Sequence, residues 1–211
     1  MKKSFPRTTP TVVLCALLCG AGGCGTAFYD SLLPADLAPA LAYVYHNSAT
    51  FAAPTQGAIA TLQTGTIVDD LKGLSGCWGA YVPNIEQTDL PPARQLNEYN
   101  TLQLAADGTY TWWILDDYGG LFPIVIAEQG QFQIVGQDRI QFTAAESKSY
   151  DPTTGTYLIY YPNPPVLVLE YLATLDGNHL KLRRLDEPGA PVPKATEPDY
   201  STTFTSFPCP G

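Results

Sequence analysis

Few side chains in this sequence have the types and spacing that catalysis or metal binding requires. The histidines are His46 and His179, whereas a zinc site needs three or four converging His, Cys or carboxylate ligands. The sequence contains neither a Gly-x-x-x-x-Gly-Lys-Ser/Thr phosphate loop nor a His-Glu-x-x-His motif. Ser75 lies in a glycine-bounded stretch like that of a nucleophile elbow, but Cys77 stands where the final glycine is required. We therefore expect no enzymatic activity, no bound metal and no cofactor.

The aspartates also offer little chemistry. Asp116 and Asp117 are adjacent, and adjacent residues of a strand point to opposite faces, so they do not form a general acid and base by themselves. Together with Asp151 they could supply calcium ligands from turns, but aspartate is common in turns for conformational reasons alone. In the segment 166–173, alternation places Glu170 opposite the larger apolar side chains, and we expect it to be solvated.

Aromatic residues are the main candidates for binding. Along the segments with strand-like alternation they could line a cavity with apolar walls and polar tips. The alternative is that they fill the interior completely, because an eight-stranded barrel is only just wide enough for side chains or one small ligand. The candidate ligand-binding residues are Tyr110, Trp112, Phe122, Phe132, Phe142, Tyr157 and Tyr161.

The elements that position these aromatics are predicted to be short strands. From residue 74 to residue 185, period-2 alternation recurs between turn signals such as Asp107-Gly108 and Asp176-Gly177. Strands joined by hairpin-length turns are antiparallel, and a long meander avoids exposed edges by closing on itself. The sequence therefore predicts an all-β fold, a single antiparallel up-and-down barrel of about eight strands.

The segment before the barrel is predicted to be a tether and a collar of helix and coil, residues 24–73. Apolar residues recur there at approximate helical spacing, but Pro39 should break or kink a helix interior. We expect one or two short helical turns that pack outside or across one end of the barrel. The tail 186–211 is rich in Pro and Thr and is expected to be an ordered coil.

The N-terminus has the pattern of an export signal, residues 1–23. Lys2, Lys3 and Arg7 precede an apolar core over residues 12–18, which is too short to span a bilayer. Residues 21–24, Ala-Gly-Gly-Cys, resemble the lipobox of bacterial lipoproteins. This resemblance implies cleavage before Cys24 and its lipidation, and hence a lipid-anchored protein of the bacterial cell envelope, on the periplasmic or cell-surface face. The alternative is an ordinary secretory signal.

Cysteine usage agrees with export. If Cys15 and Cys19 leave with the signal and Cys24 is lipidated, Cys77 and Cys209 remain. In an oxidising compartment two cysteines favour one disulfide, which would tie the tail to the first strand. The alternative is two free buried thiols.

The segment Gly76-Cys77-Trp78 resembles the Gly-x-Trp motif on the first barrel strand of the lipocalins. The resemblance covers residues 74–185 and includes the segments Asp107-Gly108-Thr109-Tyr110 and Gly130-Gln131-Phe132. It implies that an arginine late in the last strand, matched here by Arg184, lies across Trp78 and closes the barrel. It also implies a large first loop, residues 83–96, over the mouth.

Charge excludes some partners. The formal net charge is −9, and three of the 11 basic residues lie in the signal, so residues 24–211 carry eight basic against 20 acidic residues, or −12. Such a surface is not expected to bind nucleic acid or to adsorb on anionic lipid. The sequence thus predicts a non-enzymatic envelope lipoprotein whose barrel binds a small apolar or amphipathic ligand. The alternative is a packed barrel that acts as a structural or protein-interaction module.

Overall fold

The computed structural model describes residues 30–52, 66–67, 71–87, 94–118, 123–136, 138–152, 154–159, 167–190 and 201–210. Three predicted site residues, Cys24, Phe122 and Tyr161, lie outside these ranges, as does the predicted signal. The lipidation of Cys24 and any role of the other two in binding therefore remain predictions.

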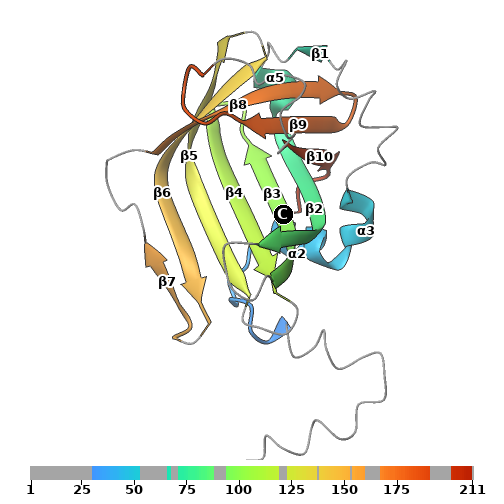
Figure 1. The fold of residues 1–211 in the computed structure, drawn as a ribbon, viewed down its shortest axis with the longest axis vertical. Coiled ribbons are helices and arrows are strands. Elements are labelled where there is room, and N and C mark those ends of the chain that lie inside the picture. The colour runs from blue at the N-terminus through green and yellow to red at the C-terminus, as the bar shows by residue number, and fades with distance from the viewer. Residues whose placement is uncertain are drawn as a thin grey trace, which may run out of the picture.

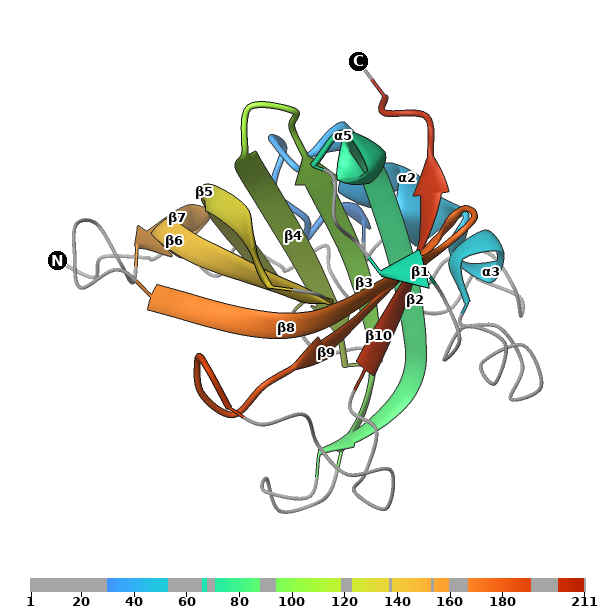
Figure 2. The same cartoon turned by 90° about the horizontal axis from the view of Figure 1, so that it is seen from above.

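The predicted fold is confirmed: eight antiparallel strands form a closed up-and-down barrel (Figures 1 and 2). Strands β2 to β6 and strands β8 to β10 pair in chain order, β10 pairs with β2, and β8 pairs with β6 to complete the circuit. Two short strands are added outside the ring, β1 on β8 and β7 on β6. The ring strands are β2 (Gly76–Gln87), β3 (Arg94–Leu104), β4 (Thr109–Asp117), β5 (Ile124–Gly136), β6 (Arg139–Asp151), β8 (Leu167–Asp176), β9 (His179–Arg184) and β10 (Ser201–Phe207); β1 is Thr66–Ile67 and β7 is Thr156–Ile159.

The expected coil tail is wrong for residues 201–207, which form β10. This strand lies between β9 and β2, with Phe204 opposite Leu180 and Ser206 opposite Trp78. Phe204 is fully buried in the barrel. A run of Thr and Ser with one large inward side chain satisfies the strand alternation, although it carries little apolar signal.

The predicted disulfide between Cys77 and Cys209 is present, with a Cα–Cα distance of 5.3 Å. Cys77 lies on β2 opposite Phe207 of β10, so the bond fastens the chain directly after the strand that completes the ring. A disulfide is typical of a non-reducing compartment.

Strand β5 runs without interruption from Ile124 to Gly136. The register of β5 on β6 shifts between Gln129 and Gly130, which marks a bulge. A Cβ atom at Gly130 would lie only 2.0 Å from the Thr143 carbonyl oxygen. Glycine is therefore required where the two backbones approach, and the extra residue of the bulge, Ala145, lies on β6.

The expected loop 83–96 is shorter than predicted, because β2 continues to Gln87 and β3 begins at Arg94. A register shift between Val82 and Ile85 absorbs Pro83 and Asn84, and Asn84 adopts a φ of 56°. The strands thus bend around the proline instead of ending there.

Helices α2 (Pro39–His46) and α3 (Ser48–Phe51) lie on the outer side of β2 and β3 (Figure 2). The prediction that Pro39 breaks a helix is wrong, because Pro39 is the first residue of α2. An N–H at that position has no partner within the helix, so its absence in proline costs nothing. A Cβ at Gly79 would come within 2.7 Å of Phe51 and Val44, so glycine on β2 permits this close packing. No helix among the described residues is long and apolar enough to cross a bilayer.

Candidate functional site at the long-loop end

The two ends of the barrel differ in their connections. At one end, which we call the Trp78 end, β3–β4, β5–β6 and β8–β9 are joined by tight turns, and α5 (Leu71–Leu74) precedes β2. At the other end, the long-loop end, longer connections join β2–β3, β4–β5, β7–β8 and β9–β10. Strands β8, β9 and β10 cross only the upper part of β3–β6 in Figure 1. The lower parts of β3–β6 therefore continue beyond the ring.

The Trp78 end is filled with side chains. Trp78 is buried, and its Nε1 donates to the Leu74 carbonyl oxygen at 2.8 Å. Phe142 lies at the centre, with ring centroids 4.9 Å from Tyr110, 5.7 Å from Trp112 and 6.1 Å from Phe132. These four candidate ligand-binding residues lie inside the barrel and contact one another, which supports a packed interior for this part of it.

Arg184 does not occupy the position expected from the lipocalin resemblance. The last ring strand is β10, which separates β9 from β2, and the residue opposite Trp78 is Ser206. Ser206 N–H donates to the Asn178 carbonyl oxygen at 2.8 Å, and Arg184 follows six residues later in β9. The expectation that Arg184 lies across Trp78 assumed that β9 was the last strand, and it is wrong for that reason.

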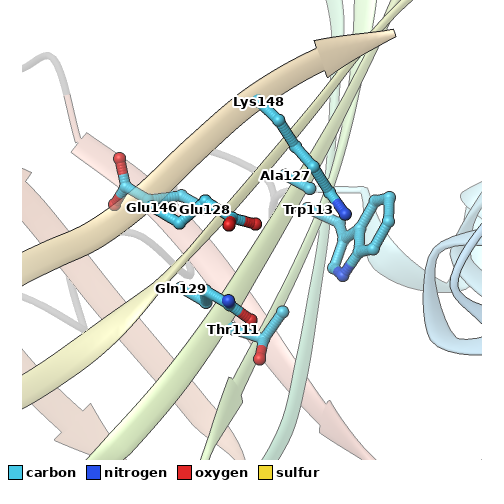
Figure 3. A pocket seen from close by; sticks show the side chains of 7 residues that line it. All are labelled: Thr111, Trp113, Ala127, Glu128, Gln129, Glu146 and Lys148. Carbon is cyan, nitrogen blue, oxygen red and sulfur yellow. The ribbon is translucent and has the colours of Figure 1, made fainter. Parts of the chain in front are cut away.

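Tyr157 was expected to line the interior, but it lies on the outer face of β7. It is opposite Tyr150, and its hydroxyl donates to Asp36 Oδ1 at 3.3 Å. Lys148 Nζ lies 4.7 Å from the Tyr157 ring centroid. It lies 5.8 Å from the ring centroid of Trp113, beside which Figure 3 shows it. Lys148 and Trp113 border a hollow of about 30 Å³ that is also lined by Thr111, Ala127, Glu128, Gln129 and Glu146, room for little more than a water molecule.

A polar layer lies inside the barrel next to the filled part. The Tyr110 hydroxyl donates to Glu128 Oε1 at 2.6 Å. Burial raises the pKa of Glu128, whereas the Tyr110 hydrogen bond and the charge of Arg184 lower it. Burial also raises the pKa of Tyr171 to about 12; Arg184 lowers that pKa, and Glu128 and Glu98 raise it. Three charged side chains thus act on one buried hydroxyl.

Glu98 and Asp116 form a carboxylate pair directly opposite one another on β3 and β4. Asn100 Nδ2 donates to Glu98 Oε1 at 2.6 Å, and Trp112 Nε1 donates to Asn100 Oδ1 at 3.1 Å. Burial raises the pKa of Asp116 to about 7, with a further contribution from the charge of Glu98. The charge of Asp117 raises the pKa of Tyr99, which packs with α2 on the outer face of the sheet. The two adjacent aspartates therefore face opposite sides of the sheet, as predicted.

Apolar side chains complete the inner face at the long-loop end. One row of register partners crosses five strands in the order Asn100, Ile114, Ile126, Ser149 and Leu158. We call Ile114, Ile126, Leu158 and the adjacent Ile124, which is opposite Asp116, the isoleucine row. Ile124 is 38% exposed and Leu158 is 54% exposed. These side chains leave apolar surface uncovered within the described structure.

Glu170 differs from expectation in another way, because it is only 5% exposed. It pairs with Arg139, whose Nη1 lies 2.6 Å from Glu170 Oε1, and it accepts a hydrogen bond from the Gly189 N–H at 3.2 Å. Arg139 Nη2 also donates to the Ala190 carbonyl oxygen at 2.8 Å. The segment after β9 folds over this outward-facing pair and excludes solvent, which alternation alone did not predict.

Among the described residues, no three His, Cys, Asp or Glu side chains are grouped so that they could hold a metal ion. Sequence comparison finds no family model that matches this chain and no curated protein similar to it.

Proposed function

We propose that this protein is a non-enzymatic, lipocalin-like binding protein that takes a small amphipathic molecule at the long-loop end of its barrel. One observation carries the proposal: the inner face changes from buried aromatic rings at the Trp78 end to half-exposed aliphatic side chains beside ionisable groups. Binding sites typically combine apolar walls with a few polar groups that fix orientation. The isoleucine row would hold the apolar part of the ligand, and the polar layer would orient its head.

The proposal places the protein in the bacterial cell envelope, anchored by a lipid on Cys24. The Cys77–Cys209 disulfide supports an oxidising setting, and the lipobox resemblance supports lipidation. Mass spectrometry of the mature N-terminus tests this part. A Cys24→Ala variant should lose the acyl mass, and an unmodified N-terminus in the parent protein would contradict the anchor.

The second candidate is a packed barrel that serves as a structural or protein-interaction module. The ring contacts around Phe142 favour it, because they leave little space in that half of the interior. The two functions differ in whether the long-loop end holds a small molecule.

Native mass spectrometry of the mature protein, purified from its envelope and then denatured, separates these candidates. Release of a small molecule on unfolding supports the binding function. The matched variants are Ile124→Ala and Val135→Ala, both on β5 with similar exposure, 38% and 42%. Ile124 faces inward at the long-loop end, and Val135 faces outward at the other end. We expect only Ile124→Ala to weaken retention of the ligand, by about 3–10-fold for partial loss of one apolar contact.

Absence of any bound molecule would contradict the binding function. So would equal retention by the two variants, because it would place the bound molecule away from the long-loop end.

A further inference from the structure

The Glu98–Asp116 pair is the part of the long-loop end whose hydrogen bonding the described chain leaves incomplete. Glu98 accepts from Asn100, but Asp116 Oδ1 is buried and has no hydrogen-bond partner in the described structure. A buried acceptor without a donor is costly, and two carboxylates placed directly opposite one another repel when both are ionised. A single bound donor that carries positive charge would relieve both effects.

No Lys or Arg whose side chain the structure describes already fills this role. Ile124 faces Asp116 from β5, and Val82 lies opposite Glu98 on β2. Asp151, at the end of β6, accepts a hydrogen bond from Thr154 Oγ1 at 3.1 Å. The charge of Arg184 lowers the pKa of Glu128, and both charges change the pKa of Tyr171. Glu128 is opposite Trp112 and thus lies nearer the Trp78 end than Asp116 does.

We propose that the long-loop end selects ligands in which a cationic amine is joined to an apolar chain. The amine donates to Asp116 and Glu98, and the chain lies on the isoleucine row, because Ile124 and Ile114 are the nearest inward neighbours of Asp116 on β5 and β4. This inference rests on the proposed function and names the chemical class of its ligand.

Other ligand classes fit less well. Among the described side chains, an anionic head would meet three inward carboxylates, Glu98, Asp116 and Glu128, against the charge of Arg184. A calcium ion needs six to eight oxygen ligands, more than this carboxylate pair provides. A neutral hydroxyl can donate only one hydrogen bond and leaves the repulsion between the carboxylates in place.

Isothermal titration calorimetry of the mature protein with three ligands of equal chain length tests the inference. The ligands are octylamine, octan-1-ol and octanoate at pH 7. We expect octylamine to bind at least about tenfold more tightly than octan-1-ol, with octanoate weakest. Equal affinity for the amine and the alcohol would overturn the amine inference and leave the proposed function intact. Binding of none of the three would also overturn it, while the released-ligand measurement would decide the proposed function separately.

Isosteric variants locate the selectivity. Glu98→Gln and Asp116→Asn should each weaken octylamine binding about tenfold and leave octan-1-ol binding unchanged. The matched control is Glu146→Gln, a carboxylate on β6 that borders the outer hollow, and it should change neither affinity. Loss of amine selectivity in Glu146→Gln, or its retention in both inner variants, would contradict the assignment.

Proton release provides a readout that does not depend on any variant. Burial raises the pKa of Asp116 to about 7 in the free protein, and a bound ammonium would lower it, so binding should release a proton. The amine stays charged over this range, because an alkylamine titrates near pH 10. Octylamine affinity should therefore rise about tenfold from pH 6 to pH 8, and octan-1-ol affinity should stay constant. A pH-independent amine affinity would overturn the inference.

Discussion

The two ends of this barrel are built from the same strands but differ in what covers their inner face. On β4, Tyr110 and Trp112 contact Phe142 in the filled interior, whereas Ile114 and Asp116, two and four positions after Trp112, line the long-loop end. Strands β8–β10 cross one part of the sheet, and the other part extends beyond them. Inward direction is therefore not sufficient for burial, and the part of the inner face that the described chain leaves half-exposed is where we propose that a ligand binds.

The largest expected effect comes from truncating the centre of the filled end. Phe142→Ala should lower the free energy of unfolding by about 3–5 kcal/mol, because it leaves a cavity among surrounding rings. Chemical denaturation measures this loss. Phe142→Leu, which keeps more volume, should cost less. A loss below about 1 kcal/mol would contradict the distinction between a packed and an uncovered part.

Opening the disulfide should have the next largest effect. Its sequence separation is 132 residues, and the chain-entropy model gives about 4–5 kcal/mol for so long a loop, although measured values are typically about 2–4 kcal/mol. We expect the paired variant Cys77→Ser/Cys209→Ser to lose about 2–4 kcal/mol. Amide hydrogen exchange should then increase first in β10, at the Trp78 end. Exchange that increases first at the long-loop end would contradict the prediction that the disulfide stabilises the Trp78 end.

Asp116 predicts a smaller effect that depends on pH. Its pKa is raised from 3.8 in the unfolded chain to about 7 in the fold, so between these values the folded state binds a proton that the unfolded state lacks. Stability contributed by this group should be present below about pH 4 and lost as the pH rises through 7. Asp116→Asn should be more stable than the parent at pH 8, by about 1–3 kcal/mol, and similar at pH 4.

Denaturation of both proteins across this pH range measures the difference. Glu146→Gln is the control, and it should leave the pH profile unchanged. A stability difference that does not vary with pH would show that the carboxyl of Asp116 titrates normally in the folded protein.

The smallest effect on stability should come from the long-loop end itself. Ile124→Ala removes a side chain that is 38% exposed, and we expect a loss below about 1 kcal/mol because little of its area is buried. A loss as large as that of Phe142→Ala would mean that the isoleucine row is a second packed core and would remove the basis for binding there.

Much of the fold could be predicted from local alternation and turn residues. Asp107 and Gly108 indicated the β3–β4 turn, and in the structure Asp107 Oδ1 accepts a hydrogen bond from the Thr109 N–H at 3.0 Å. β10 was missed because Phe204 is its one large inward residue, and only the ring shows that a strand is needed there. The bulge at Gly130 was missed because its cause is the approach of another strand.

The carboxylate pair was missed although its signal was present in the sequence. A turn at Asp107–Gly108 sets Leu104 opposite Tyr110, and counting outward from that turn brings Glu98 opposite Asp116. The burial of Glu170 had no comparable local signal. It depends on the segment after β9 folding back over Arg139, a long-range contact that alternation does not encode.

The position of β10 in the chain also sets when the barrel can form. It is the last described strand in chain order, and it pairs with β2, the first strand of the ring. Until residues 201–207 have been synthesised, β2 and β9 would both present unpaired edges, which favour association with other chains. Ring closure therefore has to await synthesis of residues 201–207. A premature stop before Ser201 should cause aggregation, because it leaves those two edges unprotected.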